Sequence, residues 1–384
     1  MKAGWVQKSI IQLSTILDSK RIPITKSDRK TGPYPYYGAS GIVDYVSDYI
    51  FDEDTLLVSE DGANLLARST PIAFSVSGKY WVNNHAHILR FDNMTTQRFV
   101  EFYLQSIKLD NFITGAAQPK LNQAALISIP IPIPNSTSEQ QRIVSILDEA
   151  FEGIATAKAN AEKNLQNARE LFESYLQSVF TQRGDGWGKR RLGDVFDIGS
   201  SKRILEKEWT SAGVPFYGGK EIVKLAKSGT VVSNAYISEE KYCDYASKYD
   251  MPRPGDILIT ARGTIGVGYV VQNDDKFYYK DGNIISMRSK VPTNPQFMLY
   301  AFMSNVMVEQ LEALTGTTVR HLPIEKAKGL ILGMPDFAAQ NTVSEQIRKI
   351  EEETHRLESI YQQKITALDE LKQSLLQKAF NGEL

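Results

Sequence analysis

Apolar and small side chains recur at alternating steps of three and four residues between positions 143 and 179. This spacing is that of a coiled-coil seam, so it predicts one long helix within residues 139–183. The same stripe returns between positions 343 and 379, each position 200 residues further on. It predicts a second long helix within residues 337–384.

The segments before these stripes have a different pattern. Short apolar runs rich in β-branched residues, such as those at 55–59 and 257–260, are separated by Gly, Pro and Asn, which is typical of strands and turns. Helical stretches are expected near 97–110 and 295–312. The mixture predicts an α+β module with a curved sheet before each long helix.

The whole chain is an internal repeat. Gly4-Trp5 returns as Gly186-Trp187 at an offset of 182. Pro35-Tyr36-Tyr37-Gly38 aligns with Pro215-Phe216-Tyr217-Gly218 at an offset of 180, whereas Leu57-Val58 aligns with Leu258-Ile259 at an offset of 201. The second copy therefore carries about 21 extra residues, between 219 and 255. We predict four segments: a first module at 1–138, a helix at 139–183, a second module at 184–336 and a helix at 337–384.

The two long helices have the same register and similar lengths, so each is the natural partner of the other. An antiparallel coiled coil would relate the two copies by a pseudo-two-fold axis and hold a module at each end. At the rise of an α-helix, the stretch from 143 to 179 would form a rod about 54 Å long. The alternative is that each helix packs only on its own module.

Two similar but non-identical modules at a fixed separation suit a DNA duplex, because each module can read its own half-site across an unread spacer. Since the modules differ in sequence, we expect an asymmetric, bipartite target. A rod of about 54 Å would span up to about 16 base pairs.

Over essentially its full length, the chain resembles the specificity subunit of type I restriction–modification systems. The resemblance rests on two modules, each followed by a helical region, and on the helix tail LLQKAFNGEL at 375–384. It also rests on the Pro-x-x-x-x-Glu-Gln helix start at 134–140 and on the Thr-Gly loop before each helix. In the second helix start Gln340 matches Gln140, but Ala339 replaces the glutamate, which should weaken that start.

The resemblance implies two target recognition domains that bind double-stranded DNA and a coiled coil that is gripped by two methyltransferase subunits. It also implies restriction subunits that join the complex for ATP-driven cleavage. S-adenosylmethionine, ATP and Mg²⁺ would then belong to the partner subunits, and this chain would have no cofactor or catalytic residue of its own.

DNA reading needs Arg or Lys for guanine and Asn or Gln for adenine, and phosphate contacts need basic side chains and small donors. In the first module the candidates, all in polar, turn-rich loops, are Lys26, Arg29, Lys30, Tyr36, Tyr37, Lys79, Tyr80, Asn83, Asn84, His85, Gln118, Lys120 and Asn122. In the second module they are Lys202, Arg203, Lys220, Arg262, Thr264, Lys280, Asn283, Thr317, Thr318, Arg320 and His321. For any one of them, a solvated loop residue is the alternative interpretation. The Ser19–Ile22 stretch is repeated verbatim, so it points to scaffold or phosphate contact, and base reading should be sought where the copies differ.

Composition bounds the interpretation. The net charge of −1 does not favour nucleic acid by itself, so a binding face must come from local clustering or from a partner. A single cysteine, Cys243, suits a reducing compartment, and without a leader or a long apolar run we expect a cytoplasmic protein that does not enter the membrane.

Other functions fit the sequence less well. Asn294-Pro295-Gln296-Phe297 resembles an adenine methyltransferase signature, but no glycine-rich loop for its cofactor precedes it, so a helix start is expected there. His85 and His87 lack the spacing of a zinc site, so no metal is expected. A coiled-coil adaptor that binds no DNA, or a stand-alone methyltransferase or nuclease, stays open as an alternative.

Overall fold

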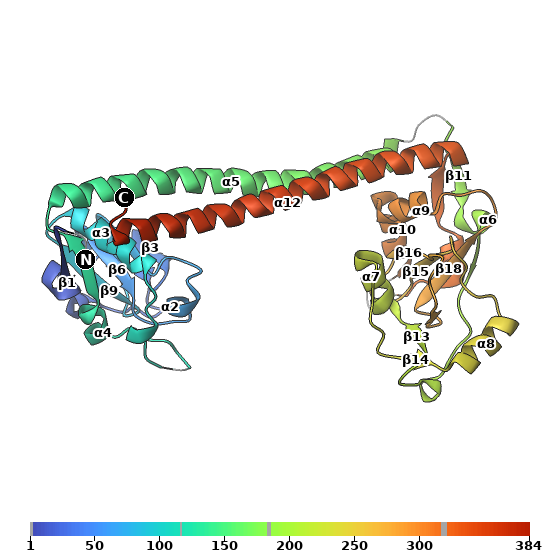
Figure 1. Cartoon of the computed structure of the whole chain (residues 1–384), viewed down its shortest axis with the longest axis horizontal. Coiled ribbons are helices and arrows are strands. Elements are labelled where there is room, and N and C mark those ends of the chain that lie inside the picture. The colour runs from blue at the N-terminus through green and yellow to red at the C-terminus, as the bar shows by residue number, and fades with distance from the viewer. Residues whose placement is uncertain (1–2, 116, 183–185, 316–320) are drawn as a thin grey trace. The chain divides into compact units, whose positions relative to one another are not determined.

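The computed structural model describes residues 3–115, 117–182, 186–315 and 321–384 (Figure 1). The chain divides into two compact units. Unit 1 comprises Met1–Lys163 and Tyr361–Leu384, and unit 2 comprises Asn164–Ile360. Each unit therefore combines one module with part of both long helices, and the helices do not form a compact body of their own.

Unit 1 contains two four-stranded sheets and a strand pair. The first sheet has the order β2 (Ser14–Ile16), β9 (Ala86–Phe91), β6 (Thr55–Ser59), β7 (Ala73–Val76), and is antiparallel. The second sheet has the order β4 (Gly41–Val46), β3 (Thr31–Gly38), β8 (Lys79–Val82), β5 (Phe51–Asp52). The strand pair is β1 (Trp5–Ser9) with β10 (Pro130–Pro134). The helices of the module are α1 (Ile10–Leu13), α2 (Asn64–Ala67), α3 (Met94–Ser106) and α4 (Gln123–Ser128).

Unit 2 repeats this plan. Its main sheet has the order β12 (Phe196–Gly199), β18 (Ile284–Ser289), β15 (Ile257–Thr260), β16 (Gly268–Val270). A smaller sheet has the order β14 (Tyr236–Ile237), β13 (Val214–Tyr217), β17 (Tyr278–Tyr279), and β11 (Gly188–Arg191) pairs with β19 (Ile331–Met334). The helices are α6 (Leu192–Val195), α7 (Gly219–Ser228), α8 (Glu239–Lys248), α9 (Pro295–Met303), α10 (Asn305–Thr315) and α11 (Ile324–Lys328).

The extra residues of the second copy form helices. In unit 1, the hairpin strand β4 and the short β5 fill the interval between β3 and β6. In unit 2, α7, β14 and α8 fill the equivalent interval between β13 and β15. The insertion predicted between 219 and 255 is therefore confirmed. Because of it, the equivalent strands β3 and β13 have different neighbours in the two units. The predicted helix start at Asn294 is also confirmed, since Asn294 caps α9 and Pro295 is its first residue.

The two long helices are α5 (Thr137–Gln182) and α12 (Phe337–Asn381), drawn in green and red in Figure 1. In unit 1 they are antiparallel, because Lys158 pairs with Asp369 at 2.7 Å while Arg142, nearer the start of α5, donates to the carbonyl of Leu384 at 2.6 Å. In unit 2 Arg169 of α5 pairs with Glu358 of α12 at 3.6 Å. The predicted antiparallel pairing is confirmed within each unit.

Each module also contacts the helix that arrives from the other copy. In unit 1 the Phe99 ring of α3 packs edge-to-face on Phe380 of α12, with centroids 5.2 Å apart. In unit 2 Phe297 of α9 packs on Phe180 of α5, with centroids 5.3 Å apart. The same aromatic contact is thus made twice, and it anchors the helix ends by apolar burial.

The predicted stripe includes Leu171 and Leu371, and this part of the predicted seam is wrong. Leu171 and Leu371 are 52% and 47% exposed, whereas Leu176 and Leu376 are buried. Near its end each helix packs on a module instead of following the partner helix. Towards the helix ends, the buried positions therefore follow the 3.6-residue period of a straight helix. The heptad positions of Leu171 and Leu371 are left exposed to solvent.

Both helix starts are built alike. Ser136 accepts from the backbone of Glu139, and Asp336 accepts from the backbone of Ala339 at 2.8 Å. The buried Gln140 and Gln340 each donate to a proline carbonyl at 2.9 Å. The second start keeps its cap and its glutamine, so the weakening expected from Ala339 is offset by Asp336. Within the described residues, no helix is both long enough and apolar enough to cross a membrane.

Candidate nucleic-acid interface

Loops from four parts of unit 1 meet at the ends of β6 and β9. The backbone N–H of Glu60 donates to the carbonyl of His85 at 2.9 Å, and that of Leu121 donates to the carbonyl of Glu60 at 2.8 Å. Asp61 and Lys120 form an isolated β-bridge. We call residues 18–21, 59–62, 83–87, 114–115 and 117–122 the unit 1 junction. It joins segments that are far apart in sequence through backbone hydrogen bonds.

Unit 2 uses the same hydrogen bonds. The backbone N–H of Ala261 donates to the carbonyl of Asn283 at 2.7 Å, and that of Leu322 donates to the carbonyl of Ala261 at 2.8 Å. Arg262 and His321 form the equivalent isolated bridge. We call residues 200–203, 260–263, 280–284 and 321–322 the unit 2 junction.

The two junctions differ in side chains although their backbones correspond. Glu60 corresponds to Ala261, Asp61 to Arg262, His85 to Asn283 and Lys120 to His321. An acidic position in unit 1 is therefore basic or neutral in unit 2. This is the pattern of one scaffold that presents two different sets of polar groups.

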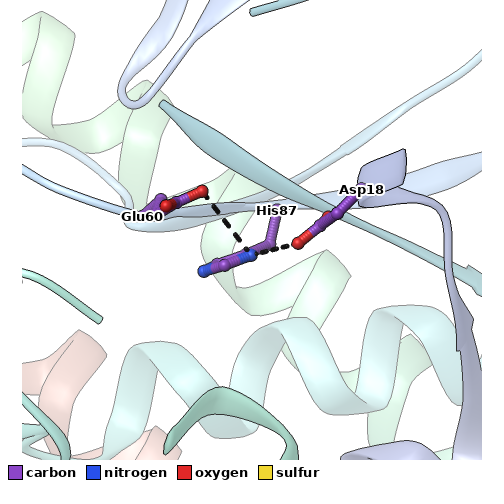
Figure 2. Close-up of side chains that lie close together, drawn as sticks. All are labelled: Asp18, Glu60 and His87. Atoms are coloured by element: carbon purple, nitrogen blue, oxygen red, sulfur yellow. Dashed lines mark hydrogen bonds and ion pairs between the residues drawn. The ribbon is translucent and has the colours of Figure 1, made fainter. Parts of the chain in front are cut away.

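A compact polar cluster of the unit 1 junction is formed by Asp18, Glu60 and His87 (Figure 2). His87 of β9 is 1% exposed, and its Nδ1 lies 2.6 Å from Oδ2 of Asp18 and 3.9 Å from Oε2 of Glu60. Its Nε2 lies 2.7 Å from the carbonyl of Leu121 and must donate to it, because a carbonyl oxygen only accepts. The ring therefore joins β9 to the loops at 18 and 121.

Glu60 is held by several cations at once. Arg21 Nη1 donates to Oε2 at 2.5 Å, and Lys120 Nζ lies 3.1 Å from Oε1. Burial pushes the pKa of the Glu60 carboxyl upward, but the hydrogen bond from Arg21 together with His87 and Lys120 outweighs burial and lowers the pKa below its usual range. Glu60 is therefore a carboxylate in the folded protein.

Asp18, Glu60 and His87 could each offer one ligand atom to a metal ion, since those atoms lie within 4.8 Å of one another. However, both ring nitrogens of His87 already make short contacts, and Arg21 and Lys120 balance the charge of Glu60. The cluster is complete as an ion-pair network and fits a structural clamp better than a metal centre.

Several predicted contact residues lie in the junctions. In unit 1 these are Asn83, Asn84, His85, Gln118, Lys120 and Asn122, all of them exposed except the buried Asn83 and the partly buried Asn122. In unit 2 they are Lys202, Arg203, Arg262, Lys280, Asn283 and His321, of which Lys280 and Asn283 are partly buried. Thr317, Thr318 and Arg320 lie outside the described residues.

Three predicted contact residues have buried side chains. Tyr36 is 1% exposed, Tyr80 is 0% exposed and Asn83 is 7% exposed. The Tyr80 hydroxyl bonds to Thr55 at 2.7 Å, and the Tyr36 hydroxyl accepts from the backbone of Ile24 at 3.1 Å. Their assignment to DNA contact is corrected: Tyr36 and Tyr80 are turned inward where the two sheets pack, and the buried Asn83 accepts from the backbone of His85 at 2.8 Å.

Several other candidates are held by structural partners. Arg29 pairs with Asp44 at 3.2 Å and lies over the Tyr36 ring, and Lys79 lies over the Tyr49 ring. Asn122 caps α4 through the backbone of Ala125. Burial raises the pKa of the half-buried Tyr37 hydroxyl, which lies in the core beside Tyr80. The remaining unit 1 candidates, Lys26 and Lys30, are exposed.

In unit 2, Lys220 lies in the first turn of α7 and Thr264 lies in the turn between β15 and β16, both exposed. Lys202 lies 5.6 Å from the centre of the Tyr249 ring, and Lys280 lies 5.5 Å from that of Trp209. Because these cations rest on aromatic faces, their ammonium groups are positioned without being neutralised.

The sequence reasoning missed the acidic members of the unit 1 junction: Asp18, Glu60 and Asp61. Carboxylates are rarely sought in a DNA-binding face, so they were passed over. The repeat itself carried the signal, because at the offset of 201 Asp61 falls on Arg262. Of the two roles expected for the Ser19–Ile22 stretch, scaffold or phosphate contact, Arg21 makes contacts of the first kind: it donates to Glu60, to the carbonyl of Asp18 and to the carbonyl of Ala86.

Comparison with known proteins gives consistent likenesses. The sequence model of the type I restriction modification DNA specificity domain matches twice, at residues 2–166 and 184–367. A putative type I restriction enzyme specificity subunit of Haemophilus influenzae is 32% identical over 356 residues, which cover 91% of this chain and 88% of the relative. The EcoBI specificity subunit of Escherichia coli is 23% identical over 308 residues, which cover 73% of this chain and 64% of the relative.

Solved structures share the fold. A chain from a type I R-M system superposes with a TM-score of 0.72 at 16% identity, covering 100% of this chain and 99% of its own. The HsdS subunit from Thermoanaerobacter tengcongensis superposes with a TM-score of 0.64 at 16% identity, covering 100% of this chain and 98% of its own.

Proposed function

The chain belongs to the type I restriction–modification specificity subunits, and we propose that it reads an asymmetric, bipartite sequence in double-stranded DNA. The specificity subunits of type I restriction–modification systems are non-catalytic. The two units would each contact one half-site through their junctions. Because DNA is the substrate, we expect the protein to act in the cytoplasm.

One observation carries the proposal: equivalent backbone hydrogen bonds present different side chains in the two junctions. Glu60 N–H donates to His85, and Ala261 N–H donates to Asn283, yet the residues alongside are Asp61 in one unit and Arg262 in the other. Residues that read different bases would be expected to differ, and these do.

The exposed or partly buried candidates divide by chemistry. Those able to read base edges are Asn84, His85, Gln118, Arg262, Asn283 and His321. Those suited to phosphate, because they offer a point charge on a flexible stem, are Lys26, Lys30, Lys120, Lys202, Lys220 and Lys280. Since the net charge is only −1, these clusters and partner subunits must supply the attraction to DNA.

Two methyltransferase subunits are proposed to dock on the long helices. The exposed Leu171 lies in unit 2 and the exposed Leu371 in unit 1, at equivalent positions of α5 and α12. Two equivalent exposed apolar side chains, one on each long helix, suit two copies of one partner. Restriction subunits would join this complex, and S-adenosylmethionine, ATP and Mg²⁺ would bind to the partner subunits.

A selection from a random duplex library tests the proposal. The chain would be assembled with its methyltransferase subunits, and bound duplexes would be sequenced. We expect two unlike blocks of specified bases separated by a fixed number of unspecified ones. The near-neutral charge also suits an adaptor that binds no DNA, and such an adaptor would enrich no sequence at all.

A further inference from the structure

We propose that Asp61 and Arg262 are specificity-determining residues that read complementary groups: Asp61 accepts from the exocyclic amine of a cytosine in one half-site, and Arg262 donates to a guanine in the other. This inference rests on the proposed function. It assigns a role to Asp61, a carboxylate on a surface otherwise expected to be basic.

The two residues occupy the same place in their units. Asp61 forms its β-bridge with Lys120, and Arg262 forms its bridge with His321. Each follows the residue whose backbone carries the junction hydrogen bonds, Glu60 in unit 1 and Ala261 in unit 2. The side chains of Asp61 and Arg262 therefore start from corresponding backbone positions, and only their chemistry is reversed.

Among the described residues, the Asp61 side chain has one hydrogen-bond partner, His85. His85 Nδ1 lies 2.9 Å from Oδ2 and 3.0 Å from Oδ1 of Asp61, and the side chains of Asp61 and His85 are 18% and 48% exposed. A carboxylate has about four acceptor positions, so most of those on Asp61 stay open after His85 has bound. His85 is exposed enough to move or to contact DNA together with it.

A carboxylate is repelled by phosphate, so a DNA-facing Asp61 can be accommodated only against a donor on a base edge. The cytosine N4 amine is the donor that a carboxylate reads in the major groove, whereas adenine is better matched by the paired donor and acceptor of Asn or Gln. The chemistry of this one side chain therefore selects cytosine.

The surroundings of Arg262 differ from those of Asp61. Its side chain is exposed, and among the described residues no hydrogen bond or ion pair engages its guanidinium. The position of Glu60, which engages Arg21 and Lys120 in unit 1, is Ala261 in unit 2, so the nearest equivalent carboxylate is missing there. A free guanidinium presents the donor pair that guanine O6 and N7 accept.

The test uses the assembled complex and the random duplex library. Asp61→Asn changes the acceptor into a group with both donor and acceptor, so preference at one position should move from cytosine towards adenine by about fivefold or more. Arg262→Ala should relax a guanine at one position of the other half-site to a similar extent. Matched controls are Asp92→Asn and Arg190→Ala, which remove exposed charges outside the junctions and should leave the selected sequence unchanged.

The outcomes separate the two levels of inference. If the unaltered complex selects no bipartite sequence, the proposed function fails and this inference with it. If a bipartite sequence is selected but both junction variants keep every specified base, the inference is overturned and the proposed function stands. A uniform loss of affinity in Arg262→Ala without a base change would assign that residue to phosphate, and reduced thermal stability alone in Asp61→Asn would assign the Asp61–His85 pair to structure.

Discussion

His87 and Asp18 are 69 residues apart in sequence, yet Nδ1 of His87 lies 2.6 Å from Oδ2 of Asp18 within the unit 1 junction. Unit 2 has no such pair at the equivalent positions, which are occupied by Ile285 and Ser200. The same fold is thus held by a polar cluster in one copy and by apolar packing in the other.

This difference predicts a non-additive mutational series. His87→Ile should destabilise unit 1 by about 3 kcal/mol, because it leaves Asp18 and the carbonyl of Leu121 without their buried partner. The triple change Asp18→Ser, Glu60→Ala and His87→Ile copies unit 2 and should recover most of that loss, because a buried ion-pair network can be replaced by well-packed apolar groups. Urea unfolding of the three proteins would check this. A triple variant less stable than His87→Ile would contradict it.

The pKa of Glu60 predicts an acid-sensitive junction. Because that pKa lies below its ordinary value of 4.5 in the folded protein, the carboxylate contributes stability that is fully present above about pH 4.5. This contribution is lost as the pH falls through the lower, folded-state pKa. Urea midpoints measured between about pH 6 and about pH 3 should therefore fall less steeply in Glu60→Gln than in the unaltered chain. Glu149→Gln, an exposed position on α5, is the control and should keep the original slope.

Leu171 and Leu371 predict where methyltransferase subunits bind. Leu171→Glu or Leu371→Glu should weaken association with one subunit by about tenfold or more, since a leucine buried at an interface contributes about 1.5–3 kcal/mol. The double variant should lose both subunits. Leu66→Glu and Leu205→Glu replace leucines that are 52% and 49% exposed outside the long helices, so they serve as controls. Analytical ultracentrifugation of the mixtures measures the stoichiometry, and equal weakening by the controls would count against the site.

The length of the long helices predicts the spacer of the target. Inserting seven residues after Lys163 in α5 and seven before Tyr361 in α12 keeps the heptad and adds about 10.5 Å to each helix, or about 3 base pairs. Library selection should then return the same half-sites with a longer spacer. Insertion into one helix alone puts the pairing out of register and is expected to abolish selection. An unchanged spacer in the double insertion would mean that other elements set the distance.

The sequence by itself determined the long helices, their antiparallel pairing, the repeat and the position of the insertion. Heptad periodicity depends on residues three and four apart, so it can be read locally. Repeats are likewise visible without knowledge of any contact. For the same reason Gln140 and Gln340 could be matched before their hydrogen bonds were known.

Only the tertiary structure decided which polar and aromatic residues face outward. Tyr36 and Tyr80 looked like loop residues, but the packing of two sheets buries them. His87 reaches Asp18 and Leu121 across 69 and 34 residues of chain, and no local pattern encodes such contacts. The physical reason is that periodicity reports the neighbours of a residue along its own element, whereas burial and ion pairing depend on which distant segments fold against it.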